Sequence, residues 1–286
     1  MRKKLNAEQL QWFIENYPEL GGLECSTILH MERATLNHIA NEHGIKVLKT
    51  TKIRHIKDKT IKRREMKIEN IKSLVFNSPE QVYTLGFLWG DGYLVNCSHI
   101  SDTLYYPELM ILSSDFSDIS QTLESIGVWN CKKSLQHNGK ERIRARLGDS
   151  TMGYFLKMHN YDKKSIMAPT SILSVIPKHL HKYWLRGYID ADGCFYVLER
   201  RSLNQFVLAG SYEQDWSEIE NIFRHLNIGY KIHHIKRHSG NYSRIQITNK
   251  HEIVKLGDFI YDNIDIGLKR KREKYYIIEK STKRFA

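Results

Sequence analysis

Two aspartates of this 286-residue chain stand at matching points of two similar segments. The first segment, YTLGFLWGDGY, contains Asp91, and the second, WLRGYIDADGC, contains Asp192, 101 residues later. Each segment is long enough for a helix with the Asp-Gly step at its C-terminal end, where Gly92 and Gly193 suit the left-handed position that follows many helices. A carboxylate there is disfavoured by about 0.3–1 kcal/mol, because the helix dipole is already negative at that end. The same local rule is broken twice at equivalent positions, and this indicates a functional site.

A divalent metal ion would relieve the repulsion between two such carboxylates. Hard oxygen ligands suit Mg²⁺, which keeps several water molecules and shares phosphate oxygens. A metal ion that bridges a scissile phosphate can activate water and stabilise the leaving oxygen. We therefore predict a Mg²⁺ site, at which Mn²⁺ or Ca²⁺ can substitute in binding. It is formed by Asp91, Asp192 and the small residues that precede them, Gly90 and Ala191.

Small residues four positions apart lie on one face of each predicted helix. They are Gly86 and Gly90 in the first segment, and Gly187 and Ala191 in the second. Helices with such faces can approach until their backbones touch. The two segments are therefore predicted to pack against each other and to bring their aspartates together.

The similarity continues downstream, so the chain contains an internal repeat. LESIGVW matches FRHLNIG, and RIRARLGD matches YSRIQITN, both at an offset of 100 residues. Each copy is predicted to run helix, strand, strand, helix, strand, strand, helix, and a last helix is expected at 269–281. The strands are expected at 93–100, 105–112, 129–137, 141–147, 194–201, 204–211, 230–238 and 242–248. Alternation of apolar and polar residues in them predicts one face packed on helices and one open face.

The part before the repeat is predicted to hold three short helices in a helix-turn-helix arrangement. Pro18 and Gly21-Gly22 are expected to end the first of these helices. The small core is expected to come from Ile28, Leu29, Leu36, Ile39 and Ile45. The predicted domains are a helix-turn-helix domain at 1–48, a basic linker at 49–77, a first repeat at 78–170 and a second repeat at 171–286.

Positive charge is concentrated outside the repeat body. The chain has a formal net charge of +12, of which +7 falls in residues 49–72 and +6 in residues 269–284. Concentrated lysine and arginine favour a polyanion, because contacts with phosphates release condensed counterions. Apolar spacing predicts helix only near the end of the linker, and its earlier part is expected either to follow a phosphate backbone or to be a solvated spacer.

WLRGYIDADG is similar to the signature of the LAGLIDADG homing endonucleases, and TLGFLWGDG resembles a degenerate first copy of it. The resemblance covers about residues 79–280. It implies an α+β protein of two pseudo-symmetric αββαββα repeats, whose antiparallel sheets form a saddle over the DNA major groove. It also implies that Asp91 and Asp192 bind the catalytic ions, and that the chain acts as a monomer without an obligate protein partner.

The same resemblance implies a catalytic basic residue after the fourth strand and third helix of each repeat. The matching segments are DKKSIMAP and LKRKREKY, in which we select Lys164 and Lys271, with Lys163 and Lys269 as alternatives. Their implied role is to polarise the nucleophilic water or to stabilise phosphate charge. The first motif has Trp89 where the second has Asp190, so Asp190 is expected to be structural.

Residues that contact DNA are expected on the open strand faces, on the third helix of the N-terminal domain and in the linker. Arginine can bind guanine through two hydrogen bonds and glutamine can do the same with adenine, and some of the candidates are expected to contact only phosphate. On the strands the candidates are Lys132, Arg142, Arg144, Arg146, Arg200, Arg201, Lys231, His233, Arg237, Arg244 and Gln246. In the N-terminal domain and linker they are Arg33, Thr35, Asn37, His38, Arg54, Lys57, Arg63 and Arg64.

The sequence thus predicts an intron- or intergene-encoded endonuclease that makes a metal-dependent staggered break in a long asymmetric target of double-stranded DNA. Two alternatives stay open: a LAGLIDADG-derived regulator that binds DNA without cutting it, and an RNA maturase. Widely spaced cysteines and the absence of a signal peptide or a long apolar run predict a cytoplasmic protein with no membrane partner.

Overall fold

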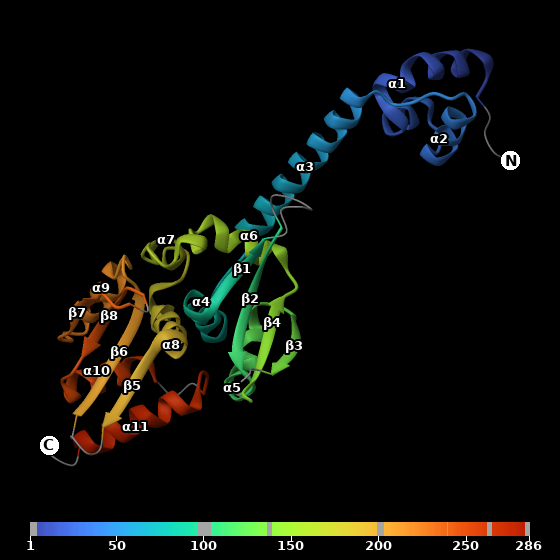
Figure 1. Cartoon of the computed structure of the whole chain (residues 1–286). Helices are drawn as coiled ribbons and strands as arrows, with labels where there is room; N and C mark the ends of the chain where they lie inside the picture. Colours follow the sequence, from blue (N-terminus) through green and yellow to red (C-terminus); the bar gives the residue numbers. More distant parts are fainter. Residues whose placement is uncertain are drawn as a thin grey trace. The chain divides into compact units, whose positions relative to one another are not determined.

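The computed structural model describes residues 5–96, 104–135, 139–198, 203–238, 240–261 and 265–283, except for the side chains of residues 56–65, 67, 198 and 203. The chain divides into two compact units, Met1–Asn70 and Ile71–Ala286 (Figure 1). Within the described ranges, no helix is both long and apolar enough to cross a membrane.

The first unit consists of helices α1 (Ala7–Leu29), α2 (Arg33–Glu42) and all but the last two residues of α3 (Lys49–Lys72). A capping box at Asn6 begins α1, which continues through Pro18 and is interrupted at Gly21, where φ is 76° and ψ is 173°. Pro18 removes one backbone donor and weakens the turn, and the glycine then adopts the positive φ that completes the kink. The predicted break is therefore confirmed at the glycine but not at the proline.

The core of the first unit differs in part from the prediction. The buried apolar residues are Phe13, Tyr17, Cys25, Leu36 and Ala40, with Leu29, Ile39 and Ile45 partly buried against them. Ile28 is wrong as a core residue, because 52% of its surface is exposed. The kink at Gly21 determines which side of the following turns of α1 faces the core. Cys25 and Leu29, which are four residues apart, lie on that side.

The basic segment predicted to be helical only near its end is helical throughout α3. No glycine or proline interrupts it, and lysine, arginine, glutamate and methionine all favour helix. Its first turns are tied to α1, since Thr51 Oγ1 donates to Glu19 O at 2.9 Å and Arg54 Nη2 lies 3.0 Å from Glu24 Oε1.

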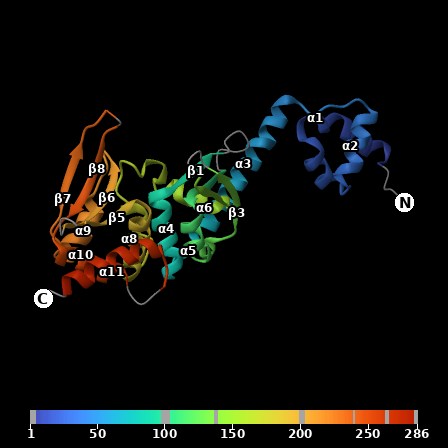
Figure 2. The ribbon, with the colours of Figure 1, turned by 60° about the horizontal axis from the view of Figure 1, so that its bottom comes forward.

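The second unit contains the predicted repeat, and the order of elements in both copies is confirmed (Figures 1 and 2). The first copy comprises α4 (Pro79–Asp91), β1 (Gly92–Asn96), β2 (Tyr105–Leu112), α5 (Ser113–Leu123), β3 (Trp129–Leu135), β4 (Glu141–Leu147) and α6 (Ser150–Met158). The second comprises α8 (His181–Asp192), β5 (Gly193–Leu198), β6 (Leu203–Ser211), α9 (Ser217–His225), β7 (Lys231–Ile235), β8 (Tyr242–Ile247), α10 (Lys250–Ile260) and α11 (Lys269–Lys283). Short helical turns lie between them: η1 (Glu124–Ile126), η2 (Tyr161–Lys163), α7 (Thr170–Leu173) and η3 (Lys178–Leu180).

Each copy forms a four-stranded antiparallel sheet, with strand orders β1-β2-β4-β3 and β5-β6-β8-β7. The predicted alternation is confirmed in β4, where Ile143, Ala145 and Leu147 are buried and the intervening arginines are not. It is also confirmed in β8, where Ile245 and Ile247 are buried beside half-buried neighbours. Each sheet therefore has one face in the core and one open face.

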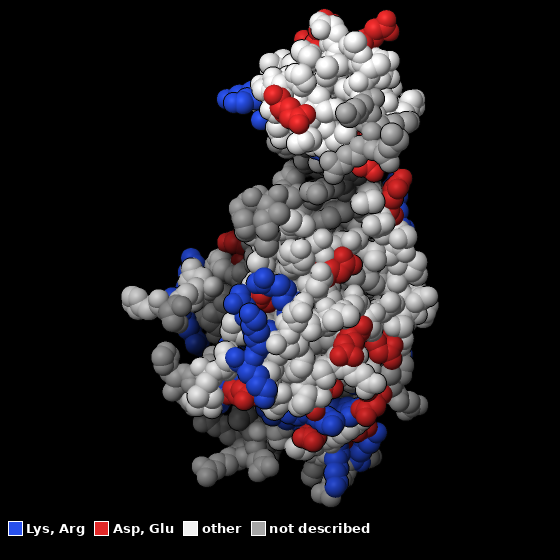
Figure 3. All heavy atoms as spheres, turned by 90° about the vertical axis from the view of Figure 1, so that its right-hand side faces the viewer, with Lys and Arg blue, Asp and Glu red and all other residues white. Residues whose placement is uncertain are grey.

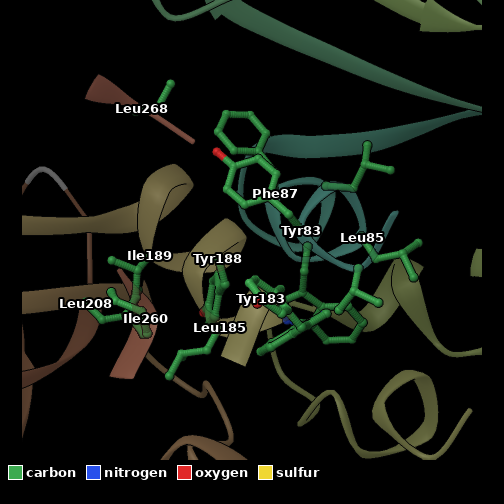
Figure 4. Close-up of a cluster of buried hydrophobic side chains, with 14 of the residues drawn as sticks. Tyr83, Leu85, Phe87, Tyr183, Leu185, Tyr188, Ile189, Leu208, Ile260 and Leu268 are labelled. Atoms are coloured by element: carbon green, nitrogen blue, oxygen red, sulfur yellow. The ribbon is translucent and has the colours of Figure 1, made fainter. Parts of the chain in front are cut away.

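Helices α4 and α8 pack directly against each other at the centre of this unit. A Cβ added to Gly86 would lie 1.9 Å from Trp184 O, and one added to Gly187 would lie 2.1 Å from Tyr83 O. Around this contact, aromatic and aliphatic side chains from both helices fill the core, including Tyr83, Phe87 and Tyr188 (Figure 4). The predicted close approach of the two glycine faces is confirmed.

Candidate active site

The last residues of the two packed helices are the two motif aspartates. Asp91 ends α4 and Asp192 ends α8, as predicted. The glycines that follow are not left-handed, because Gly92 has φ −84° and Gly193 has φ −81°, and each begins a strand directly. They are required by space instead: a Cβ on Gly92 would lie 2.7 Å from Leu88 O, and one on Gly193 would lie 2.7 Å from Ile189 O.

The two carboxylates share one environment at the ends of the paired helices. A Cβ added to Gly90 on α4 would lie 3.1 Å from Asp192 Oδ2 on α8. Both side chains reach solvent, yet the surrounding protein raises the pKa of both carboxyl groups. Burial raises the pKa of Asp192 to about 6, with a further increase from the charge of Asp91 and opposition from Lys164 and Lys271. Burial also raises the pKa of Asp91, against the opposing charges of Lys271 and Lys164.

The two selected lysines cap the helices that carry the aspartates. Lys164 Nζ donates to Trp89 O at 2.6 Å and to Gly90 O at 2.5 Å. Lys271 Nζ donates to Ile189 O at 3.0 Å, to Ala191 O at 3.3 Å and to Gly193 O at 2.5 Å. Each ammonium group thus neutralises the negative end of its own motif helix.

The charges of the two repeats also interact across the interface. Burial lowers the pKa of Lys164 to about 8, and the charges of Asp192 and then Asp91 oppose this change. Burial lowers the pKa of Lys271 as well. Among the lysines, Lys271 acts more strongly on Asp91 and Lys164 acts more strongly on Asp192. Each lysine therefore contacts the helix end of its own repeat, and its charge acts on the aspartates of both repeats.

Asp190 is held inside the protein by hydrogen bonds. It is 1% exposed, and its Oδ2 accepts from Tyr83 Oη at 2.9 Å and from Leu268 N at 2.8 Å. In the first repeat the equivalent Trp89 instead packs edge-on against Tyr161 and Trp184, with ring centroids 5.9 Å and 6.0 Å away. The structure thus places Asp190 as a link between α8 and the segment before α11.

The donor set fits a divalent cation. In the described part of the chain, neither Asp91 nor Asp192 accepts a hydrogen bond from protein, so their oxygens are available. Both carboxylates lie at the negative ends of helices, and their pKa values are raised. A bound cation would offset the negative helix dipole and would favour the charged form of each carboxylate. The carbonyl oxygens of Gly90 and Ala191, also predicted for this site, accept from the lysines. Among the described residues, no group of three or more histidine, cysteine or acidic side chains forms a further candidate metal site.

The raised pKa of Asp192 predicts a change in stability. A carboxyl group whose pKa rises on folding stabilises the folded state below its unfolded pKa near 4, and this contribution is lost as pH rises through about 6. Without metal, Asp192→Asn should therefore raise the free energy of unfolding at pH 7 by about 1 kcal/mol, after allowance for solvent screening of a partly open group.

Denaturant unfolding in chelator at pH 7 and at pH 4.5 measures this effect. The advantage of the variant should shrink at pH 4.5, where the wild-type carboxyl is protonated, and Mg²⁺ should stabilise the wild type more than the variant. A variant that is less stable than the wild type at pH 7 without metal would contradict the assignment.

On the first sheet, the three predicted arginines of β4 lie on the open face with Lys132, which pairs in register with Arg144. Beneath them is a residue that the sequence interpretation missed. Glu108 is 0% exposed and accepts from Arg144 Nε at 2.5 Å, Arg146 Nε at 2.7 Å and Tyr93 Oη. Burial alone would raise its pKa, but the hydrogen bonds from Tyr93, Arg144 and Arg146 hold the pKa of Glu108 below its usual value. Glu108 therefore orients two guanidinium groups whose remaining edges stay open.

The second sheet carries a different set of side chains. Lys231 pairs in register with Gln246, and His233 pairs with Arg244, so all four lie on one face. Gln246 Nε2 donates to Gln205 Oε1 at 2.7 Å. Lys231, His233 and Gln246 also line an open cavity of about 490 Å³. Arg237 follows β7 and its guanidinium lies 5.5 Å from the centroid of the Tyr242 ring.

The remaining predicted DNA contacts fall in three groups. Arg33 and His38 are exposed on α2 and Thr35 is half-buried, whereas Asn37 turns toward α1 and its Oδ1 accepts from Tyr17 Oη at 3.0 Å. Arg54 is paired with Glu24 within the first unit. Outside the described residues lie Arg200, Arg201 and the side chains of Lys57, Arg63 and Arg64. Figure 3 shows lysine and arginine side chains gathered in a band on the face of the second unit seen there.

No family model and no curated protein matches the sequence. Among solved structures, the homing endonuclease I-WcaI bound to its DNA recognition sequence is similar over 73% of this chain and 91% of its own, with 17% identity and a TM-score of 0.50. A mutant of I-SmaMI matches over 72% and 92%, with 16% identity and a TM-score of 0.48. The LAGLIDADG meganuclease I-AabMI bound to uncleaved DNA matches over 72% and 91%, with 14% identity and a TM-score of 0.45.

The likeness to I-WcaI is one of fold, and in this chain the fold consists of two antiparallel sheets joined through paired helices that end in aspartate. The chain contains the fold of the LAGLIDADG homing endonucleases.

Proposed function

We propose that this protein is a site-specific DNA endonuclease that makes a metal-dependent, staggered double-strand break, with one strand cut at each of two centres. The observation that carries the proposal is the paired arrangement of Asp91 and Asp192 at adjoining helix ends, each of which is capped by a lysine. An aspartate and a lysine at each of two adjoining helix ends are suited to two antiparallel phosphodiester strands. I-WcaI, which shares the fold, is a homing endonuclease bound to its DNA recognition sequence.

Each group of the site has a distinct role in this proposal. Asp91 and Asp192 hold the divalent ions, preferentially Mg²⁺, which when bound activate water and stabilise the leaving oxygen. Lys164 and Lys271 keep positive charge beside the scissile phosphates and fix the helix ends through the backbone carbonyls that they contact. Because Lys164 has a pKa of about 8, its ammonium group is mainly charged at neutral pH.

The open sheet faces supply the recognition of sequence. Arg144 and Arg146 are oriented by Glu108 and can each bind guanine through their free guanidinium edges, while Gln246 can bind adenine. The two faces differ, since the position of Glu108 corresponds by register to Val207, a buried apolar residue. The proposed target is therefore long and asymmetric.

We also propose that the N-terminal domain extends the contact with DNA. The second half of α1, the turn at residues 30–32 and α2 have the lengths of a helix-turn-helix motif, with α2 as the recognition helix. Arg33 and His38 are its exposed candidates. The basic helix α3 then supplies contacts to phosphate.

Selection of bound sequences from a randomised duplex library, followed by cleavage of a supercoiled plasmid that carries the selected site, tests the function. The expected result is a linear product in Mg²⁺ and intact plasmid in chelator. Specific binding without cleavage would identify a DNA-binding regulator instead. Tighter binding to a structured intron RNA than to any duplex would identify a maturase. Either outcome would overturn the proposal.

A further inference from the structure

The helix that carries Lys271 is held at its start by acidic residues of the other repeat. Arg270, in the first turn of α11, donates from Nε to Asp115 Oδ1 and from Nη2 to Asp115 Oδ2, both at 2.7 Å. Lys269 N donates to Asp118 Oδ2 at 3.1 Å. Both acids belong to α5 of the first repeat, and α11 belongs to the second (Figure 1).

This contact fixes the position of the first turn of α11 relative to α5. Asp115 is 5% exposed, and a two-bond pair between arginine and a buried carboxylate sets the orientation of both groups. The preceding residue is held as well, since Leu268 N donates to Asp190 Oδ2 at 2.8 Å. Residues 268, 269 and 270 are thus each anchored by a different acid, and Lys271 is the next residue.

The segment that carries Lys164 is likewise contacted by the second repeat, where Asp215 acts through its backbone and Glu218 through its side chain. Asp215 N donates to Ile166 O at 3.3 Å. Thr170 Oγ1 donates to Glu218 Oε1 at 2.7 Å. Asp215 and Glu218 stand 100 residues after Asp115 and Asp118. The same position in each repeat therefore contacts the lysine segment of the other.

We propose that Asp115, with Asp118, is a positioning residue for Lys271, so that the first repeat controls the strand served by the lysine of the second. This inference rests on the proposed endonuclease function. Lys271 Nζ reaches the end of α8 through contacts of 2.5–3.3 Å. Loss of the anchor would let the first turn of α11 shift, and small displacements of a catalytic group can reduce a rate by about a hundredfold.

Strand-resolved cleavage of the selected plasmid site by full-length protein provides the test. Lys271→Met and Lys164→Met each identify the strand that depends on one lysine. Asp115→Asn, which keeps the shape of the side chain, should slow the Lys271-dependent strand at least about tenfold and accumulate nicked plasmid. Asp118→Asn, a second variant at the same contact between α5 and α11, should also slow the Lys271-dependent strand more than the other strand. Glu279→Gln, which breaks an exposed ion pair near the far end of α11, is the matched control and should show no such difference.

Hydrogen exchange without DNA supplies a readout that does not depend on cleavage. Asp115→Asn should increase exchange at the amides of residues 268–272 and leave residues 163–167 unchanged. Equal slowing of both strands, slowing of the Lys164-dependent strand, or unchanged exchange at 268–272 would overturn the inference. A wild-type protein that cuts neither strand would refute the endonuclease function, and the exchange result would still show whether Asp115 holds this segment.

Discussion

Asp91→Asn and Asp192→Asn should each reduce Mg²⁺-dependent cleavage by at least about a thousandfold, because each removes a carboxylate from a metal site that supplies several kcal/mol of transition-state stabilisation. Binding of the uncut target should be no weaker than in the wild type, since either change removes one negative charge from a surface that faces phosphates. Plasmid cleavage and a binding titration, both at one stated salt concentration, measure the two effects.

A matched control lies on the same helix. Glu80→Gln neutralises an acid in the first turn of α4, at the opposite end from Asp91, and should cleave as the wild type does. Retained cleavage in either aspartate variant would remove the metal assignment. Equal loss of binding and cleavage would instead show that the aspartates maintain the folded site rather than the chemistry.

Local patterns were sufficient to predict the architecture of the second unit. Alternation in strands such as β4 and the repeated Asp-Gly steps depend on neighbours within a few residues, and both predictions are confirmed. The conformation of Gly92 was not predictable in the same way. An Asp-Gly step at a helix end usually indicates a left-handed turn, but here the chain enters a strand at once, and close packing against Leu88 O makes glycine necessary.

The candidate site was predictable only where the repeat itself marks it. Asp91, Asp192 and their lysines come from motifs and matching segments, and the structure brings them together. The ion pair between Asp115 and Arg270 joins residues 155 positions apart, so its existence depends on which helices meet. For Glu108 the sequence contained a weaker indication. In the strand YYPELMIL, Glu108 is two residues from Met110 and so lies on the same face of the sheet, and Met110 pairs with Arg144 on the open face.

Gly187→Ala should destabilise the second unit more than any surface change, by about 3 kcal/mol or more. A Cβ at this position would lie 2.1 Å from Tyr83 O and 2.6 Å from Phe87 N, both backbone atoms of α4. Rotation of a side chain cannot relieve these contacts, so the two helices would have to separate and the two aspartates would move apart. Denaturant unfolding measures the loss, and Gly229→Ala, whose Cβ would meet nothing within 4 Å, should stay within about 0.5 kcal/mol of the wild type.

Gly90 provides a comparison in which the added methyl group would meet a side chain rather than the backbone. A Cβ on Gly90 would lie 2.3 Å from the Ala191 Cβ, so Gly90→Ala should also destabilise the protein. The added Ala191→Gly change removes the obstructing methyl group, and the double variant should recover most of the loss. No such exchange exists for Gly187, whose obstacle is the main chain. Equal stability of Gly187→Ala and the wild type would show that the motif helices are not in backbone contact, and the pairing of the aspartates would then lose its structural basis.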